Sequence, residues 1–139
     1  HPAAIPGLSD GGAHVRTICD VSCPTTLLQG WGRDRPHGRI PVETLVAKQS
    51  RRTAEALGLR DRGVLAPGYR ADINVIDFDG LRLHAPEIRR DLPAGGKRMI
   101  QRATGYRHTF VAGAEVAADG ESTGETPGRL IRGPQEARA

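Results

Sequence analysis

The segment Gly7-Leu8-Ser9-Asp10-Gly11-Gly12-Ala13-His14 contains the residue of this chain with the clearest chemical potential. It follows a short apolar run and places one acid, Asp10, among small residues where a buried strand would open into a loop. A carboxylate in such a position can take up and return a proton during hydrolysis. Because one carboxylate does not make an active site, we expect this chain to be the closing part of an enzyme whose other catalytic residues lie upstream.

Charge and composition argue against two classes of partner. The formal net charge is +4, but basic and acidic residues are interleaved, as in Arg60-Asp61-Arg62, and aromatic residues make up only 4% of the chain. Nucleic-acid binding needs a clustered basic face and stacking aromatics, so we expect no nucleic-acid partner. No apolar run approaches the roughly 20 residues of a membrane span, so we expect no membrane contact.

The two cysteines indicate the compartment. Cys19 and Cys23 are the only cysteines, and no further Cys or His stands at the paired short spacings of a zinc finger. We therefore expect two buried or half-buried free thiols and a cytoplasmic location.

The elements that must position Asp10 are short, as 18 Gly and 10 Pro among 139 residues suggest. Residues 3–9 read as a buried strand, although Pro6 removes a ladder donor. Residues 24–31 predict a helix with Pro24 in its first turn, and residues 32–39 predict a loop. A stronger helix is expected over residues 41–57, where apolar residues recur at helical spacing and Gly58 follows as a cap.

After Gly58 the pattern changes to strands. Residues 73–77, 98–103 and 109–116 predict strands, the last with a hairpin turn at Ala112-Gly113-Ala114, and Asp119-Gly120 marks another turn. Residues 83–96 contain two prolines and a Gly-Gly pair, and predict an ordered loop with at most one helical turn. The tail after Gly133 is polar and predicted to be frayed.

Several stretches together resemble the C-terminal portion of the amidohydrolase superfamily. They are Ser9-Asp10-Gly11 after an apolar strand, a helix ending Arg-Arg-Thr-Ala-Glu-Ala-Leu-Gly-Leu at residues 51–59, and Asp-Arg-Gly-Val-Leu-Ala-Pro-Gly-Tyr-Arg-Ala-Asp-Ile-Asn-Val-Ile-Asp at residues 61–77. The junction at residues 68–72 is specific to the superfamily when it follows such a helix. Residues 111–116 and the Thr-Gly-Glu-Thr-Pro-Gly-Arg ending at residues 123–129 are similar to the N-acyl-D-amino-acid deacylase branch.

This resemblance implies a fold of the α/β plus β class. A (β/α)8 barrel would carry the metal site at the C-terminal ends of its strands, beside a small β-sandwich built from both chain ends. Residues 1–60 would then supply the last strand and helices of the barrel. Residues 61–139 would supply the C-terminal share of the sandwich and a polar tail.

The resemblance also implies roles for individual residues. The family aspartate that matches Asp10 ligates or approaches zinc and handles the proton of the metal-bound water. His14 is a candidate substrate-binding residue that either faces the same cleft or orients the loop, and Arg16 is a candidate partner for the substrate carboxylate. The chain departs from the branch here, because the His-Pro-Arg that follows the family aspartate is missing and Cys19-Asp20-Val21-Ser22-Cys23 stands nearby instead.

The implied reaction is hydrolysis of the linear amide bond of small N-acyl-D-amino acids. Most zinc ligands would lie outside this chain, so the remainder of the parent chain would be needed and this part alone should be inactive. The alternative is a non-catalytic, β-rich interaction module derived from an amidohydrolase, in which Asp10 is vestigial. An upstream His-x-His motif would favour the deacylase.

Overall fold

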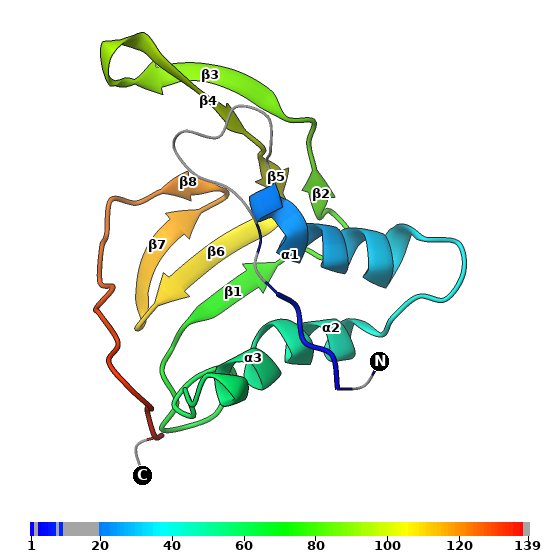
Figure 1. Ribbon diagram of the computed structural model, residues 1–139, viewed down its shortest axis with the longest axis vertical. Coiled ribbons are helices and arrows are strands. Elements are labelled where there is room, and N and C mark those ends of the chain that lie inside the picture. Colours follow the sequence, from blue (N-terminus) through cyan, green and yellow to red (C-terminus); the bar gives the residue numbers. More distant parts are fainter. Residues whose placement is uncertain (2, 8, 10–19, 138–139) are drawn as a thin grey trace.

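The computed structural model describes residues 1, 3–7, 9 and 20–137. Figure 1 shows three parts: short helices, a four-stranded antiparallel sheet, and a two-stranded ribbon that projects beyond the sheet. Apart from the short helical turn η3 (Pro93–Gly95), the helices precede all the strands along the described chain. The described part is therefore rich in sheet and contains few, short helices.

The first helical segment begins at η1 (Asp20–Ser22) and continues through α1 (Cys23–Thr26) into the π-type helix η2 (Leu27–Asp34). The helix predicted over residues 24–31 is confirmed, but it continues into the predicted loop at residues 32–39. Arg33 holds this extension, because its guanidinium donates to the carbonyls of Phe78 (2.5 Å), Asp79 (2.9 Å) and Leu81 (2.7 Å).

The second helical segment is divided into α2 (Val42–Gln49) and α3 (Arg51–Ala56). The break lies at Ser50 (φ −118°, ψ −86°), whose hydroxyl donates to the carbonyl of Val46 (2.6 Å). At the end of α3, Gly58 adopts φ +73°, its N–H bonds the Glu55 carbonyl, and the Leu59 N–H bonds the Ala54 carbonyl. This is the cap expected for a glycine at that position, so the predicted helix over residues 41–57 is confirmed apart from the break.

The main sheet has the strand order β1-β6-β7-β8, with every pair antiparallel. Its strands are β1 (Ile73–Ile76), β6 (Tyr106–Val111), β7 (Ala114–Ala118) and β8 (Glu121–Ser122). Two-residue turns at Ala112-Gly113 and Asp119-Gly120 join the last three strands, and all four turn residues have positive φ. The strands predicted over residues 73–77 and 109–116 and both turns are confirmed.

The projecting ribbon corrects one prediction. Residues 83–96 were expected to form a loop, but they contain β3 (Glu87–Leu92) and the short helical turn η3 (Pro93–Gly95). β3 pairs with β4 (Gly96–Ile100), and β2 (Arg82–Leu83) pairs with β5 (Ala103–Thr104) at the base of the ribbon. The exposed, charged sequence of β3 hides its strand character, which depends on pairing with β4 and on the cross-strand ion pair Arg98–Asp91 (2.7 Å).

The strand predicted over residues 3–9 is absent from the described residues of that segment, 3–7 and 9. A strand must satisfy its backbone groups with neighbouring strands, and the described residues supply none here. Instead, the Lys48 ammonium donates to the carbonyls of His1 (3.1 Å) and Ala4. Ile5 is 43% exposed.

The C-terminal tail is more ordered than its composition suggests. Gln135 forms a parallel bridge with Leu59, its N–H bonds the Gly58 carbonyl (2.9 Å), and its carbonyl accepts from Arg60 (2.8 Å). The prediction of a frayed end after Gly133 is therefore wrong at Gln135, because tertiary pairing supplies bonds that local sequence cannot show.

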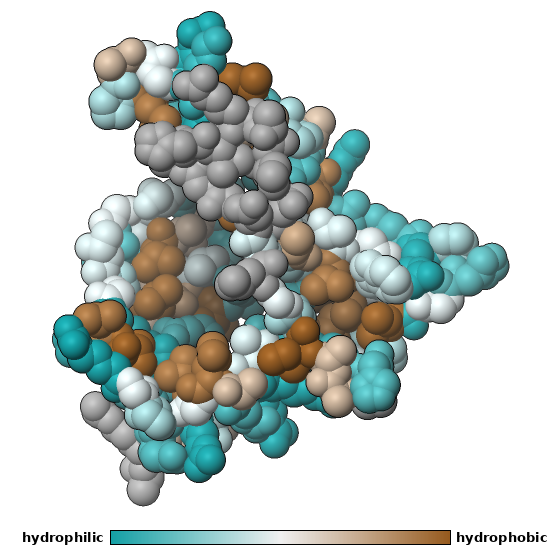
Figure 2. All heavy atoms as spheres, viewed as in Figure 1, coloured by the Kyte–Doolittle hydropathy of each residue, from teal (hydrophilic) through white to brown (hydrophobic). Residues whose placement is uncertain are grey.

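The core is small and lies between the helices and the start of the ribbon. Leu28, Leu45 and Leu81 are buried, and they are joined by partly buried residues: Ile40, Val42, Ile76, Phe78 and Tyr106. No residue of the four-stranded sheet is fully buried, and Figure 2 shows hydrophobic side chains in view over β6 and β7. Within the described part of the chain, no helix is long and apolar enough to cross a membrane.

Candidate functional site

The predicted catalytic residue Asp10 and the predicted substrate-binding residues His14 and Arg16 lie outside the described residues. The structure does describe how the chain is fixed on both sides of them. Before Asp10, Lys48 of α2 bonds the carbonyls of His1 and Ala4. After Arg16, the Ser22 hydroxyl donates to Gln101 Oε1 (2.7 Å), and the Thr25 and Tyr106 hydroxyls lie 2.7 Å apart.

These contacts tie the flanks of the candidate loop to two different elements. The preceding segment is attached to the helix α2, and the following segment is attached to residues at the start of β6 and between β4 and β5. Residues 10–19 thus join two anchored points.

No group of three or more His, Cys, Asp or Glu residues among those described could hold a metal ion. His108 Nδ1 lies 2.6 Å from Glu115 Oε1, and His84 Nε2 lies 3.3 Å from the Thr104 hydroxyl. Cys23 is a free thiol, as expected, but it is exposed rather than buried or half-buried, and Cys19 lies outside the described residues. His84 and His108 therefore each have a polar contact with a neighbouring side chain.

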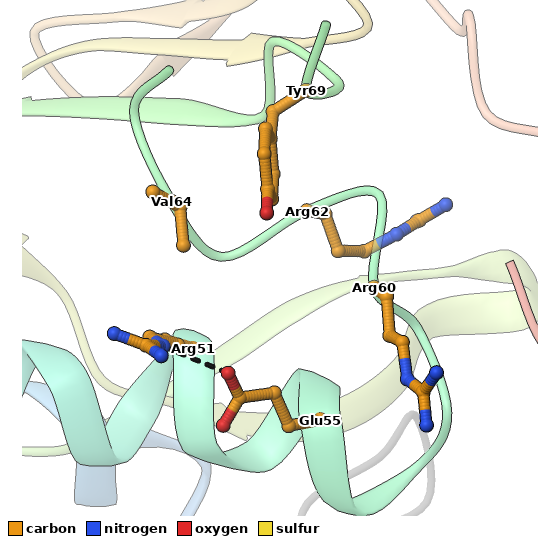
Figure 3. Close-up of a pocket in the computed structure, with 6 residues that line it drawn as sticks. All are labelled: Arg51, Glu55, Arg60, Arg62, Val64 and Tyr69. Carbon is orange, nitrogen blue, oxygen red and sulfur yellow. Dashed lines mark hydrogen bonds and ion pairs between the residues drawn. The ribbon is translucent and has the colours of Figure 1, made fainter. Parts of the chain in front are cut away.

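A depression of about 350 Å³ lies between α3 and the loop that follows it (Figure 3). Six residues line it: Arg51, Glu55, Arg60, Arg62, Val64 and Tyr69. The loop passes very close to the helix at Gly63, where a Cβ atom would lie 2.8 Å from the Arg51 Cα and where φ is +83°. Glycine is therefore needed at this crossing, which sets the loop residues opposite α3.

The arginines of the depression differ in how firmly they are paired. Arg62 has a side chain only 17% exposed and donates to both carboxylate oxygens of Asp61 (2.8 and 2.9 Å). These hydrogen bonds raise the pKa of the Arg62 guanidinium and lower the pKa of the Asp61 carboxyl. Arg60 makes one long contact with Glu136 (3.4 Å), and both side chains are about two-thirds exposed.

Arg51 and Glu55 form an i,i+4 ion pair on the floor of the depression, with Nε 2.7 Å from Oε1. The hydrogen bond to Glu55 raises the pKa of the Arg51 guanidinium. Figure 3 shows Tyr69 and Val64 extending from the loop toward these two residues. The arrangement can attract an anion, but it contains no Ser, Cys or His that could act as a nucleophile or base.

Sequence reasoning did not single out this depression. The interleaved charges of Arg60-Asp61-Arg62 are typical of a solvated surface, which fits Arg60 but not the largely covered Arg62. The spacing of Arg51 and Glu55 was the one local signal available. Their proximity to Val64 and Tyr69 depends on the path of the loop.

Comparison with known proteins identifies the family. The family model described as the amidohydrolase family matches residues 1–117. A D-aminoacylase from Alcaligenes xylosoxydans xylosoxydans is 35% identical over 97 residues, which cover 70% of this chain and 18% of that protein.

A solved structure gives the same assignment. The crystal structure of a D-aminoacylase, presented as defining a novel subset of amidohydrolases, matches with a TM-score of 0.56 and 33% identity, over 73% of this chain and 19% of that one. The chain thus spans about a fifth of the length of the relatives it matches. Since the family model covers most of the chain and both relatives are D-aminoacylases, the chain belongs to the amidohydrolase family and resembles D-aminoacylase.

Proposed function

We propose that this chain is the C-terminal part of a zinc-dependent hydrolase that cleaves the linear amide bond of N-acyl-D-amino acids. The observation that carries the proposal is the match to D-aminoacylase in both sequence and fold. The substrate would be a small molecule, and hydrolysis would yield a carboxylate and a free D-amino acid. A reducing cytoplasm is the proposed location.

The proposal divides the chain into residues 1–60, which end a (β/α)8 barrel, and residues 61–139, which contribute to a β-sandwich. Exposed apolar side chains on the α2–α3 segment support the first part. Val46 in α2 is 48% exposed, and Leu57, which follows α3, is 68% exposed. Leu45 and Ala54 are buried, so the segment has apolar side chains both in the core and at the surface, where a further layer of the barrel could cover them.

The open sheet supports the second part. β1, β6, β7 and β8 contain no fully buried residue, and Val75 in β1 is 44% exposed. A sheet normally buries one face against a second layer. The proposed second layer is the remainder of the sandwich, contributed by the rest of the polypeptide.

The exposed area is also large for an independent domain. The chain exposes 9844 Å², whereas a compact monomer of 14.9 kDa exposes about 7,000 Å². The difference exceeds the roughly 800 Å² per partner of a standard interface. This supports the proposal that the remainder of the parent chain covers these surfaces and that this chain alone is inactive.

Asp10 is the residue we assign to catalysis and to the zinc site, and His14 and Arg16 are the candidate substrate-binding residues, Arg16 for the substrate carboxylate. The described residues offer no metal-binding group. Most zinc ligands would come from other parts of the polypeptide.

The decisive experiment measures zinc content and hydrolysis of N-acetyl-D-amino acids on the full-length protein and its Asp10→Ala variant. We expect zinc-dependent release of free amine that is lost in the variant while the protein stays folded. Asp79→Ala is the matched control, since Asp79 is exposed and its carboxylate forms no hydrogen bond or ion pair with a described residue. A parent protein with no zinc and no hydrolysis would instead favour the non-catalytic interaction module, and a fully active Asp10→Ala variant would contradict the catalytic role of Asp10.

A further inference from the structure

The guanidinium of Arg51, which we call the fork, lies on the floor of the depression between α3 and the following loop and has hydrogen-bond donors to spare. Arg51 uses its Nε atom to bond Glu55. Its two terminal nitrogens bond no described residue. A guanidinium presents its donors in a fixed planar arrangement that suits both oxygens of a carboxylate. Glu55 thus orients Arg51 without using the rest of the fork.

A second donor faces this fork from the loop. The Tyr69 hydroxyl bonds no described residue, and Figure 3 shows its ring extending from the loop toward Arg51 and Glu55. The proximity of Tyr69 is also one of the causes, after Glu55, that raise the pKa of the Arg51 guanidinium. Two donors from different elements therefore converge on the same space.

The remaining lining defines the kind of ligand. Each arginine of the depression has an acidic partner, so the preference for an anion depends on the unused terminal donors of Arg51 and on the weak, exposed contact of Arg60. Val64, 37% exposed, supplies an apolar wall. A volume of about 350 Å³ accommodates a compact organic acid.

We propose that this depression binds a small monocarboxylate with a compact apolar body, held by the terminal nitrogens of Arg51 and the Tyr69 hydroxyl. The apolar body lies against Val64. Arg60 adds long-range attraction, because its exposed contact with Glu136 is weak enough to exchange. The site is independent of the proposed hydrolase activity and contains none of the residues assigned to it.

The test is ligand-observed NMR of isobutyrate with the full-length protein, and isobutyramide serves as the neutral isostere. We expect millimolar binding of isobutyrate, at least tenfold weaker binding of the amide, and weakening at high salt. Arg51→Gln should reduce isobutyrate affinity at least tenfold. Tyr69→Phe, which removes one hydroxyl donor and keeps the ring, should reduce it about fivefold.

Arg89→Gln is the matched control. Arg89 is another exposed arginine, on the ribbon, paired with Glu87 (2.8 Å), and its replacement should leave binding unchanged. The proposal is overturned if isobutyramide binds as well as isobutyrate, or if Tyr69→Phe and Arg51→Gln both bind normally. It is also overturned if the wild-type protein binds neither compound. That result is expected if a carboxylate from elsewhere in the same polypeptide already binds the terminal nitrogens of Arg51. Because the readout is binding, a parent without deacylase activity still gives a clear result.

Discussion

Gly105 is the position at which adding a single methyl group should destabilise the sheet the most. It precedes β6 with φ +100°, and an added Cβ would lie 2.7 Å from the Leu81 Cα and 2.9 Å from the Leu81 nitrogen. Its carbonyl also accepts the Asp77 N–H (2.8 Å), which joins β1 to β6 beyond their last paired residues. Backbone atoms cannot move aside as a flexible side chain would, so Gly105→Ala must shift either the buried Leu81 or this hydrogen bond.

The magnitude follows from two additive costs. A side chain at positive φ costs about 1–2 kcal/mol, and forcing extra volume against packed backbone costs about 1–3 kcal/mol more. Gly113→Ala separates the two, because Gly113 follows the same strand with φ +84° and an added Cβ would meet nothing within 4 Å. We therefore expect Gly113→Ala to show only the first cost and Gly105→Ala to show both.

Hydrogen exchange of peptides from β1 and β6 in the full-length protein measures this difference as a local opening free energy. The extra cost in Gly105→Ala should appear as about 5- to 150-fold faster exchange than in Gly113→Ala, at tenfold per 1.4 kcal/mol. Equal exchange in the two variants would refute the argument that close backbone approach fixes this crossing.

Three further predictions concern the small core and the turn before β2. Arg33→Met should speed exchange in this turn by an amount equivalent to about 2–4 kcal/mol, because it removes three charge-assisted bonds to backbone carbonyls; retained protection would contradict the role of Arg33. Leu81→Ala should destabilise the protein by about 2–5 kcal/mol in urea unfolding, since Leu81 is fully buried, and a loss below 1 kcal/mol would show that the site collapses easily. The Gly80 N–H and then Arg107 lower the pKa of the Asp77 carboxyl, so its stabilising effect is complete above the ordinary aspartate pKa of about 3.9 and is lost as pH falls through its lowered folded value. The melting temperatures of wild type and Asp77→Asn should therefore differ at pH 6 and converge toward pH 2, and a constant difference would exclude this linkage.

Local chemistry made the helices and the hairpins predictable. Gly58 ends the helix because it can adopt positive φ, and the residue pairs at 112–113 and 119–120 fit two-residue turns for the same reason. The motifs that resemble the amidohydrolases are contiguous stretches of sequence, so the family could be recognised without a structure. The candidate catalytic assignment to Asp10 rests on that resemblance and remains a prediction.

The features that could not be predicted depend on residues distant in sequence. β3 is a strand because Arg98 and the rest of β4 lie beside it. No periodicity of apolar residues in its sequence predicts that pairing. Residues 3–9 read as a strand in sequence, but a strand forms only where neighbours satisfy its backbone, and the described residues offer Lys48 instead.

The sequence by itself determined the family, the order of most elements and the turn positions, because these depend on short motifs and on the conformational preferences of single residues. The tertiary structure alone decided the ribbon, the ordering of Gln135 and the depression in which Arg51 faces Tyr69. The loop that forms this depression can cross α3 closely only because Gly63 has no side chain that would clash with the Arg51 backbone. Such contacts depend on how segments approach one another in space, which local sequence preferences do not specify.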